Sequence, residues 1–207
     1  MASNGIFEIF TRVYIINMQE HETRWAQVLQ ELKKVGINDF HRFEGIKVNN
    51  GETMRDREIG CMLSHQAIIR ECKEKNIERV LILEDDVEFS EKTIEFLEKE
   101  DVKGFIKEVP FDLFYLGCNF NGRNNRVVND FVVQVEYGFS THCYCVSRQA
   151  YDYILNMNEK LGLAYDILLT QIQAHFQSYC IMPRIAFQRK GMSYIQNKEC
   201  DYDRVLK

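Results

Sequence analysis

Apolar runs alternate with helix-periodic segments at the start of the chain. Residues 12–18 (RVYIINM) are rich in β-formers and apolar, which is typical of a buried strand. Apolar side chains then recur at helical spacing over residues 25–35, and Gly36 stands where helices commonly end. A further short strand is expected at residues 40–44. Strand, helix and strand in this order indicate a mostly parallel sheet.

The pattern repeats in the middle of the chain. A second helix is predicted over residues 57–75, and a continuous apolar strand over residues 79–83 (RVLIL). Ser90 is positioned to cap a short helix. Residues 112–116 (DLFYL) predict another buried strand, which Gly117 ends.

The last third is more mixed. We expect a loop over residues 119–125 and strands over residues 131–135 and 141–147. A helix from about residue 148, another over residues 165–176 and a final strand over residues 179–182 should follow. The whole order predicts an α/β fold, with a mostly parallel sheet flanked by helices and a mixed, partly antiparallel C-terminal part.

Composition favours one globular domain. The chain has 207 residues, 45% of them hydrophobic and 28% charged, enough for one substantial core. With 2 prolines and 11 glycines, it has no Pro/Gly/Ser-rich linker. The net charge of −5 argues against a nucleic-acid partner, which needs clustered Lys and Arg.

Cysteine usage and the N-terminus bear on location. The 7 cysteines are scattered without a CxxC pair, so we expect free, mostly buried thiols and a reducing compartment. No signal peptide and no apolar run long enough for a membrane span is visible. The expected location is the cytoplasm, and the oligomeric state is left open.

The sharpest chemical feature is the acidic run that follows the strand at 79–83. Glu84, Asp85 and Asp86 would stand at the carboxyl end of a buried strand, where ligands bind in open α/β sheets. Three like charges there call for a positive partner, and Mn²⁺ or Mg²⁺ bridging a diphosphate is a natural one. Alternation along a strand would turn Glu84 and Asp86 to one side and Asp85 to the other. The plainer alternative is that strand-end acids simply meet solvent.

Several landmarks resemble glycosyltransferase family 25, which includes bacterial lipooligosaccharide and collagen galactosyltransferases. They occur in the family's order over roughly residues 12–195. They are Tyr14-Ile15-Ile16-Asn17 with Arg24, Glu58-Ile59-Gly60-Cys61 with Ser64-His65, Leu81 to Val87 (LILEDDV), Gly138 with Thr141-His142-Cys143-Tyr144, then Asp166, and less distinctly Pro183 and Gln188. Two departures stand out, because the fourth motif reads GFSTH and Ala164-Tyr165 precedes the acid.

The resemblance implies a GT-A type fold in a single domain, with a nucleotide-sugar half at about 10–118 and an acceptor half at about 119–207. It implies an inverting, metal-dependent transfer of a hexose, galactose or glucose, from a UDP-sugar to a glycan or hydroxylysine hydroxyl. Asp166 would be the catalytic base. The expected donor-binding residues are Asn17, Arg24, Ser64, His65, Glu84, Asp85, Thr141 and His142, and the expected ligands of Mn²⁺ or Mg²⁺ are Asp86, Glu84 and His142.

Plainer interpretations stand beside these roles. Asp166 could be only a helix cap, Arg24 a solvated helix-face residue, and His65 and His142 hydrogen-bonded core residues. A nucleotidyltransferase or phosphohydrolase also places acids around Mg²⁺ at a strand end, although no Gly-rich phosphate loop is present. A non-catalytic nucleotide- or sugar-binding module is the alternative outside enzymes.

Overall fold

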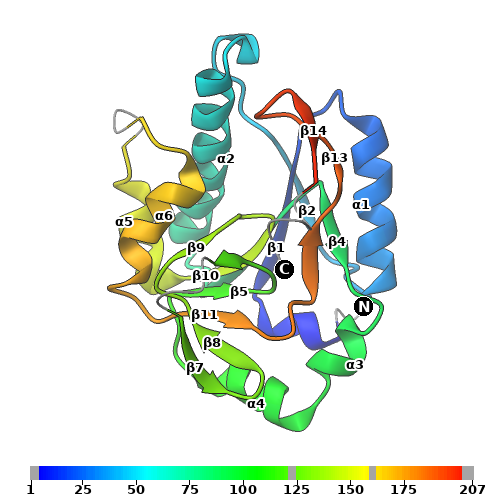
Figure 1. Cartoon of the computed structure of the whole chain (residues 1–207), viewed down its shortest axis with the longest axis vertical. Helices are drawn as coiled ribbons and strands as arrows, with labels where there is room; N and C mark the ends of the chain where they lie inside the picture. Colours follow the sequence, from blue (N-terminus) through cyan, green and yellow to red (C-terminus); the bar gives the residue numbers. More distant parts are fainter. Residues whose placement is uncertain (1–4, 121–124, 159–161, 202–207) are drawn as a thin grey trace.

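The computed structural model describes residues 5–120, 125–158 and 162–201. Figure 1 shows one central sheet with helices on both faces. The sheet has eight strands in the order β2-β1-β3-β10-β5-β11-β8-β7. Their bounds are β1 (Arg12–Asn17), β2 (His41–Glu44), β3 (Arg79–Glu84), β5 (Leu113–Tyr115), β7 (Arg126–Asn129), β8 (Val132–Gln134), β10 (Cys143–Ser147) and β11 (Ser178–Ile181).

Three two-stranded sheets complete the strands. They pair β4 (Val87–Phe89) with β12 (Ala186–Gln188), β13 (Gly191–Ser193) with β14 (Lys198–Cys200), and β6 (Asn119–Phe120) with β9 (Gly138–Phe139). The helices are α1 (Glu22–Lys34), α2 (Met54–Glu74), α3 (Thr93–Leu97), α4 (Glu100–Glu108), α5 (Tyr151–Leu155) and α6 (Tyr165–Gln173), with short 3-10 turns at Gly5–Ile9, Asn49–Gly51 and Arg148–Ala150.

Strand directions confirm the predicted α/β fold. β1 pairs in parallel with both β2 and β3, so the N-terminal part of the sheet is parallel. β10 then runs antiparallel between β3 and β5, and only the β5–β11 pair beyond it is parallel. The sheet is therefore parallel where strands alternate with helices along the chain and mixed towards the C-terminus, as the sequence indicates. The division into two functional halves remains a prediction.

Each face of the sheet has its own hydrophobic core. α2, α5 and α6 pack on one face through a cluster that includes Ile68, Ile154 and Leu168. α1, α3 and α4 cover the other face, through residues such as Leu32 and Ile106. Because β-strand side chains alternate between faces, neighbouring residues of β3 join opposite cores.

Most predicted boundaries agree with the structure to within a few residues. Gly36 has φ +74 and ends α1 as expected, because glycine adopts this left-handed conformation readily. α2 begins earlier than predicted, at a capping box between Thr53 and Asp56 that was not anticipated. Ser90 is not the cap of α3, since the helix begins after Lys92, although the Ser90 hydroxyl accepts the Lys92 N–H.

The second half of the chain, with the helix just before it, holds the larger differences. α4, β7 and the β13–β14 hairpin were not predicted, and the predicted loop 119–125 includes β6 at its start while its residues 121–124 lie outside the described part. All seven cysteines are free thiols and five are buried, as predicted: Cys72, Cys118, Cys143, Cys145 and Cys180. Within the described part of the chain, no helix combines the length and the apolar character that crossing a membrane requires.

Candidate functional site

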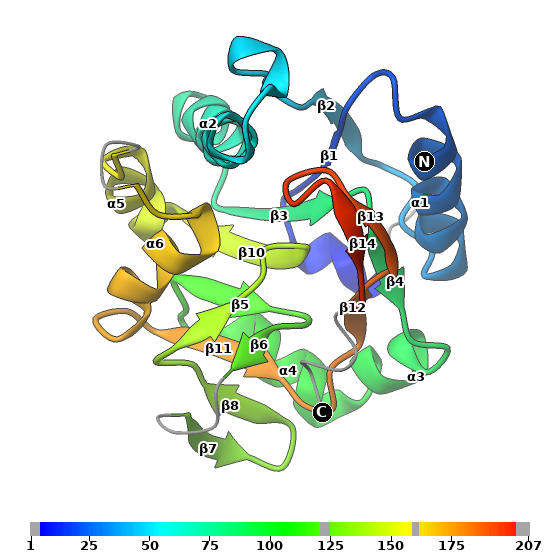
Figure 2. The same cartoon turned by 45° about the horizontal axis from the view of Figure 1, so that its top comes forward.

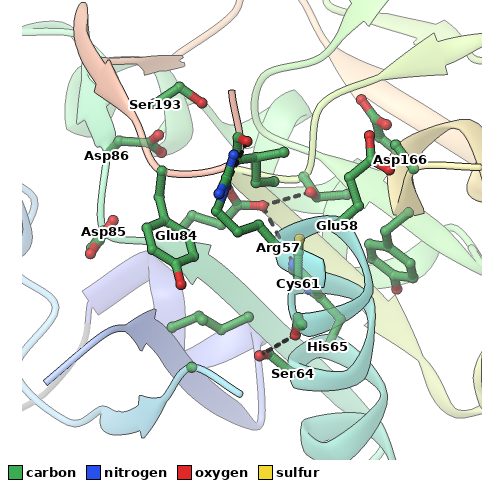
Figure 3. A pocket seen from close by; sticks show the side chains of 18 of the residues that line it. Arg57, Glu58, Cys61, Ser64, His65, Glu84, Asp85, Asp86, Asp166 and Ser193 are labelled. Atoms are coloured by element: carbon green, nitrogen blue, oxygen red, sulfur yellow. Dashed lines mark hydrogen bonds and ion pairs between the residues drawn. The ribbon is translucent and has the colours of Figure 1, made fainter. Parts of the chain in front are cut away.

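A cavity of about 510 Å³ opens at the carboxyl ends of β1 and β3. Its walls come from those strand ends, the first half of α2, the beginning of α6 and the turn between β13 and β14 (Figure 3). Figure 2 shows how α2, α6 and the β13–β14 hairpin are arranged relative to β1 and β3. Nearly all the expected site residues line it: Asn17, Arg24, Ser64, His65, Glu84, Asp85, Asp86, Thr141 and Asp166. His142 does not.

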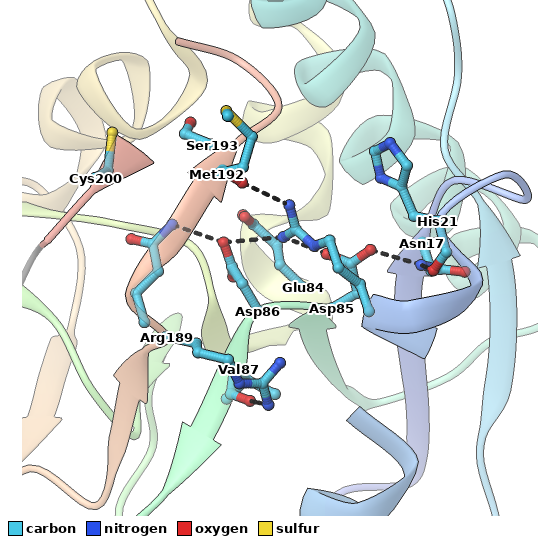
Figure 4. A network of polar contacts seen from close by, with 12 residues as sticks. Asn17, His21, Glu84, Asp85, Asp86, Val87, Arg189, Met192, Ser193 and Cys200 are labelled. Atoms are coloured by element: carbon cyan, nitrogen blue, oxygen red, sulfur yellow. Dashed lines mark hydrogen bonds and ion pairs between the residues drawn. The ribbon is translucent and has the colours of Figure 1, made fainter. Parts of the chain in front are cut away.

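The acidic run is held by Arg24 of α1. The Arg24 guanidinium forms ion pairs with Asp85 Oδ1 and, at 3.1 Å, with Asp86 Oδ2. Asp85 Oδ2 also accepts a hydrogen bond of 2.6 Å from Asn17, and Asp86 Oδ2 accepts one of 3.0 Å from Gln188. Figure 4 shows this network between the ends of β1 and β3 and the C-terminal strands. The positive partner of these two carboxylates is therefore a side chain of the protein.

The three acids do not alternate as expected. β3 ends at Glu84, and Asp85 and Asp86 form a turn before β4 begins at Val87. Because extended backbone stops there, Asp85 and Asp86 both face Arg24, and all three carboxylates line the cavity. The predicted separation of Asp85 from the other two is therefore wrong.

Burial raises the pKa of both aspartates of the turn. It raises the pKa of Asp85 to about 6, against the pull of Arg24. Burial and the neighbouring Glu84 raise the pKa of Asp86 too. Among the described residues, Asp86 Oδ1 has no hydrogen-bond partner although it is buried. An unpaired buried carboxylate oxygen is costly, so this atom is the open acceptor of the cluster.

Glu84 is held on the other side, towards α2. Its Oε1 accepts a hydrogen bond of 2.6 Å from Thr141 and lies 3.4 Å from His65 Nε2. Burial acts to raise the pKa of Glu84, but His65 and Thr141 outweigh it and the pKa is lowered. Thr141 reaches Glu84 because β10 runs antiparallel to β3, with the Glu84 N–H bonded to the His142 carbonyl.

α2 supplies one wall through residues three and four apart, which share a helix face. Those that line the cavity are Met54, Arg57, Glu58, Cys61, Ser64 and His65, along with Gly60. The Ser64 hydroxyl donates to the Gly60 carbonyl and accepts the Ile46 N–H, at 2.7 and 2.8 Å. A β-carbon on Gly60 would lie 2.3 Å from the Ile46 carbonyl oxygen. Gly60 and Ser64 thus join α2 closely to the loop after β2.

Asp166 stands in the first turn of α6, whose N-cap is Ala164. Its two carboxylate oxygens accept backbone N–H bonds from Ser140 and Ile167, at 3.2 and 2.9 Å. Burial nevertheless raises the pKa of Asp166. In Figure 3 Asp166 lies across the cavity from Asp85 and Asp86. Asp166 therefore binds a backbone N–H group at the beginning of α6 and also lines the cavity.

Two expected binding residues are occupied by internal contacts. The Asn17 amide donates to Asp85 and accepts from Arg42, which leaves it orienting a carboxylate. His142 is buried beneath the cavity, with Nε2 3.3 Å from the Ala186 carbonyl oxygen, and burial lowers its pKa. His142 was expected to bind the metal or the donor, but the structure does not bring it to the cavity.

Other lining residues received no role from the sequence. Arg57 donates to the Ile195 carbonyl and so joins α2 to the C-terminal turn, and Tyr194 of that turn packs edge-on against His21. The polar sequence of residues 191–200 carries no periodic signal that could have indicated this wall. Cys61 and Glu58 lay within a motif but had no assigned function.

The donor set at Asp86 fits a hard divalent cation. Asp86 Oδ1 is free and buried, and Glu84 lies close enough to raise the pKa of Asp86. Mg²⁺ and Mn²⁺ commonly bind one or two carboxylates, with water and phosphate oxygens completing the shell. Arg24 pairs with one oxygen each of Asp85 and Asp86, and Asn17 holds the other Asp85 oxygen, so the protein offers few ligands and leaves room for a phosphorylated molecule.

Comparison with known proteins identifies relatives. The family model described as glycosyltransferase family 25 (LPS biosynthesis protein) matches residues 10–169. "Inactive glycosyltransferase 25 family member 3" of Mus musculus is 40% identical over 131 residues, covering 52% of this chain and 22% of that protein. The Homo sapiens protein of that name is 40% identical over 70 residues, covering 33% of this chain and 11% of its own. The chain thus spans about a fifth of the mouse protein's length.

Similarities to solved structures are more distant. A197 from STIV has a TM-score of 0.48 and 12% identity, covering 91% of this chain and 92% of that one. A glycosyltransferase involved in the glycosylation of the major capsid of PBCV-1 has a TM-score of 0.36 and 16% identity, covering 72% of this chain and 64% of that one.

Proposed function

The chain belongs to glycosyltransferase family 25, and we propose that it transfers a hexose, galactose or glucose, from a UDP-sugar to a hydroxyl of a glycan or hydroxylysine. The observation that carries this proposal is the placement of acids around one cavity. Asp85 and Asp86 lie on one side and Asp166 on the other (Figure 3). An inverting transfer needs this division, with the leaving group stabilised on one side and a base on the opposite side.

Asp86 is the residue that would hold Mn²⁺ or Mg²⁺, through its open Oδ1 and with Glu84 nearby. Such an ion supplies positive charge for the diphosphate that leaves as the glycosidic bond breaks. Arg24 acts as a positioning residue, because it fixes both aspartates at the turn. Asn17 supports the same geometry by holding Asp85.

Asp166 is the proposed base. Its backbone hydrogen bonds from Ser140 and Ile167 fix the carboxylate towards the cavity, where an acceptor hydroxyl would approach. Burial raises the pKa of Asp166 towards neutral pH, which makes its carboxylate a better proton acceptor than that of an exposed aspartate. The hydroxyl proton passes to Asp166 as the oxygen attacks the anomeric carbon and UDP departs.

A second candidate is nucleotide-sugar binding without turnover. Relatives at 40% identity carry the word "inactive" in their names, and Arg24 already pairs with two of the three strand-end carboxylates. If Arg24 keeps the cation out, the cavity would still accommodate a nucleotide sugar. This candidate predicts UDP binding that is independent of Mn²⁺.

The deciding experiment measures UDP release from a panel of UDP-sugars with Mn²⁺, by the wild type and by Asp86→Asn. Glu88→Gln is the matched control, because Glu88 is an exposed acid two residues away on β4. Release with one donor, abolished by chelation and by Asp86→Asn but retained in Glu88→Gln, supports the transferase. Binding of a UDP-sugar without UDP release supports the second candidate. Pyrophosphate release in a parallel assay with UTP and a sugar 1-phosphate would instead indicate a nucleotidyltransferase.

A further inference from the structure

A second group of metal-ligating atoms lies on the α2 side of the cavity. Cys61 Sγ, a ring nitrogen of His65 and a carboxylate oxygen of Glu84 all lie within 4.8 Å of one another. From this geometry we propose that Cys61, His65 and Glu84 form a site for a thiophilic divalent cation of the Zn²⁺ class. This site adjoins the hard-cation site at Asp86 through Glu84, but its other two ligands are different, and it does not require sugar transfer.

The spacing of the three residues suits such an ion. Cys61 and His65 are four residues apart on α2, so they stand one above the other on the same face. A tetrahedral zinc ion with bonds of about 2.0–2.3 Å places its ligand atoms about 3.3–3.8 Å apart. His65 Nε2 and Glu84 Oε1 are already 3.4 Å apart. Cys61 Sγ lies within 4.8 Å of both atoms.

His65 carries the second, independent observation. The residue is fully buried, and its Nε2 has no hydrogen-bond partner among the described residues. The other ring nitrogen, Nδ1, lies 3.0 Å from the Tyr144 hydroxyl, and the ring stacks on Tyr165 at 4.6 Å. A metal requires the tautomer in which Nδ1 donates to Tyr144, so that Nε2 presents a lone pair to the ion in place of a proton to Glu84.

Outer contacts hold the remaining ligand in place. Thr141 donates a hydrogen bond of 2.6 Å to Glu84 Oε1. Metal-ligating histidines and carboxylates usually have such partners, which fix their orientation. Tyr144 and Thr141 would fill that role here, since each contacts one ligand and lies on or next to β10.

The chemistry of the donors separates this site from Asp86. Thiolate and imidazole select Zn²⁺ over Mg²⁺ and Mn²⁺, whereas an all-oxygen set does the reverse. Burial raises the pKa of the Cys61 thiol, so a cation must displace the thiol proton in order to bind there. All three ligands line the cavity, so a fourth coordination position would face it and remain open to water or a bound molecule.

The test uses the metal-free chain of 207 residues, titrated with Co²⁺ and, separately, Zn²⁺. Co²⁺ bound to a thiolate gives a near-ultraviolet charge-transfer band, which we expect for the wild type with one ion per chain. Cys61→Ser should abolish the band and weaken Zn²⁺ by more than about 100-fold, since losing even an outer-shell partner costs about 10–100-fold. Cys200→Ser is the control, because Cys200 is the other cysteine that is not fully buried.

Two further variants keep the result interpretable. Glu84→Gln retains an acceptor for Thr141 and should weaken Zn²⁺ in calorimetry, even if Cys61→Ser lowers the melting temperature. Asp86→Asn should leave the cobalt band intact while it abolishes Mn²⁺-dependent UDP release, so the two proposals fail separately. A wild type without the band, or Zn²⁺ binding that is equal in Cys61→Ser and the wild type, would overturn the site and leave His65–Glu84 as an internal polar pair.

Discussion

Arg24 lies 3.1 Å from Asp86, between Nη2 and Oδ2, and the same nitrogen also pairs with Asp85. A residue of the first helix therefore neutralises the turn that follows the third strand. The side chains are only 22% and 16% exposed, so water screens this pair weakly. A cation bound at Asp86, as proposed above, would therefore share these two carboxylates with Arg24.

Replacing Arg24 by Gln should lower the stability of the metal-free protein and strengthen its binding of Mn²⁺. Without the guanidinium, metal-free protein should lose roughly 3 kcal/mol of unfolding free energy, the lower end for breaking a buried pair, because Arg24 keeps some solvent contact. Mn²⁺ should bind several-fold more tightly, since the freed aspartates repel one another and lack a cation. Urea denaturation in chelator and Mn²⁺ calorimetry measure the two effects.

Lys33→Gln is the control for that experiment, because Lys33 is an exposed cation on the same helix. It should change neither quantity appreciably. Equal Mn²⁺ affinity in Arg24→Gln and the wild type would show that Arg24 and the cation do not share these carboxylates.

Asp85 predicts a pH dependence of stability. Burial raises its pKa to about 6 from the usual 3.8, so between these values the folded state holds a proton that the unfolded chain has released. This contribution is fully present below about pH 4 and is lost as the pH rises through about 6. Asp85→Asn should therefore gain stability relative to the wild type as the pH rises from 4 to 7.

Denaturation in chelator across that range, with both proteins side by side, gives the difference directly. Added Mn²⁺ should reduce it, because a cation nearby favours the charged form of Asp85. A difference that stays constant with pH would contradict the raised pKa.

Gly60 and Gly104 form a matched pair of helical glycines with opposite expectations. A β-carbon on Gly60 would lie 2.3 Å from the Ile46 carbonyl oxygen, whereas one on Gly104 meets nothing within 4 Å. Gly104→Ala should stabilise the protein by about 0.5–1 kcal/mol through helix propensity. Gly60→Ala should destabilise it by about 1–3 kcal/mol, because α2 must move from the loop. Urea denaturation of both variants tests this, and stabilisation by Gly60→Ala would refute the close approach.

The features predicted well from the sequence are local ones. The apolar run before Glu84 predicted a buried strand, and the acids at its end line the cavity. Both were predictable because consecutive residues indicate the strand and the position where it ends. Helix ends with a strong local cause, such as Gly36, were also predictable. The family motifs added Asp166, which no local pattern distinguishes from a capping residue.

What escaped prediction depends on packing between distant segments. The contact of Arg24 with Asp86 joins residues 62 positions apart and exists only once α1 packs against β4, which begins at the next residue. The orientation of Asp85 depends on where β3 ends. Side-chain alternation predicts the wrong side for Asp85, because this residue already lies in the turn after the strand. The β13–β14 hairpin has short polar strands (GMS and KEC) without an alternating pattern, so its place in the cavity wall had no sequence signal.

Asp166 and Asp101 allow a capping role to be separated from a catalytic one. Each is the second residue of its helix, and each accepts the next backbone N–H through Oδ1, at 2.9 and 3.0 Å. Only Asp166 lines the cavity, because Asp101 is exposed on α4. Asp166→Asn should lower kcat for sugar transfer by about 10²–10⁴-fold, the usual contribution of a general base, and leave UDP and Mn²⁺ affinity unchanged. Asp101→Asn should cost similar stability with full activity; equal activity in the two variants would reduce Asp166 to a helix-terminus residue.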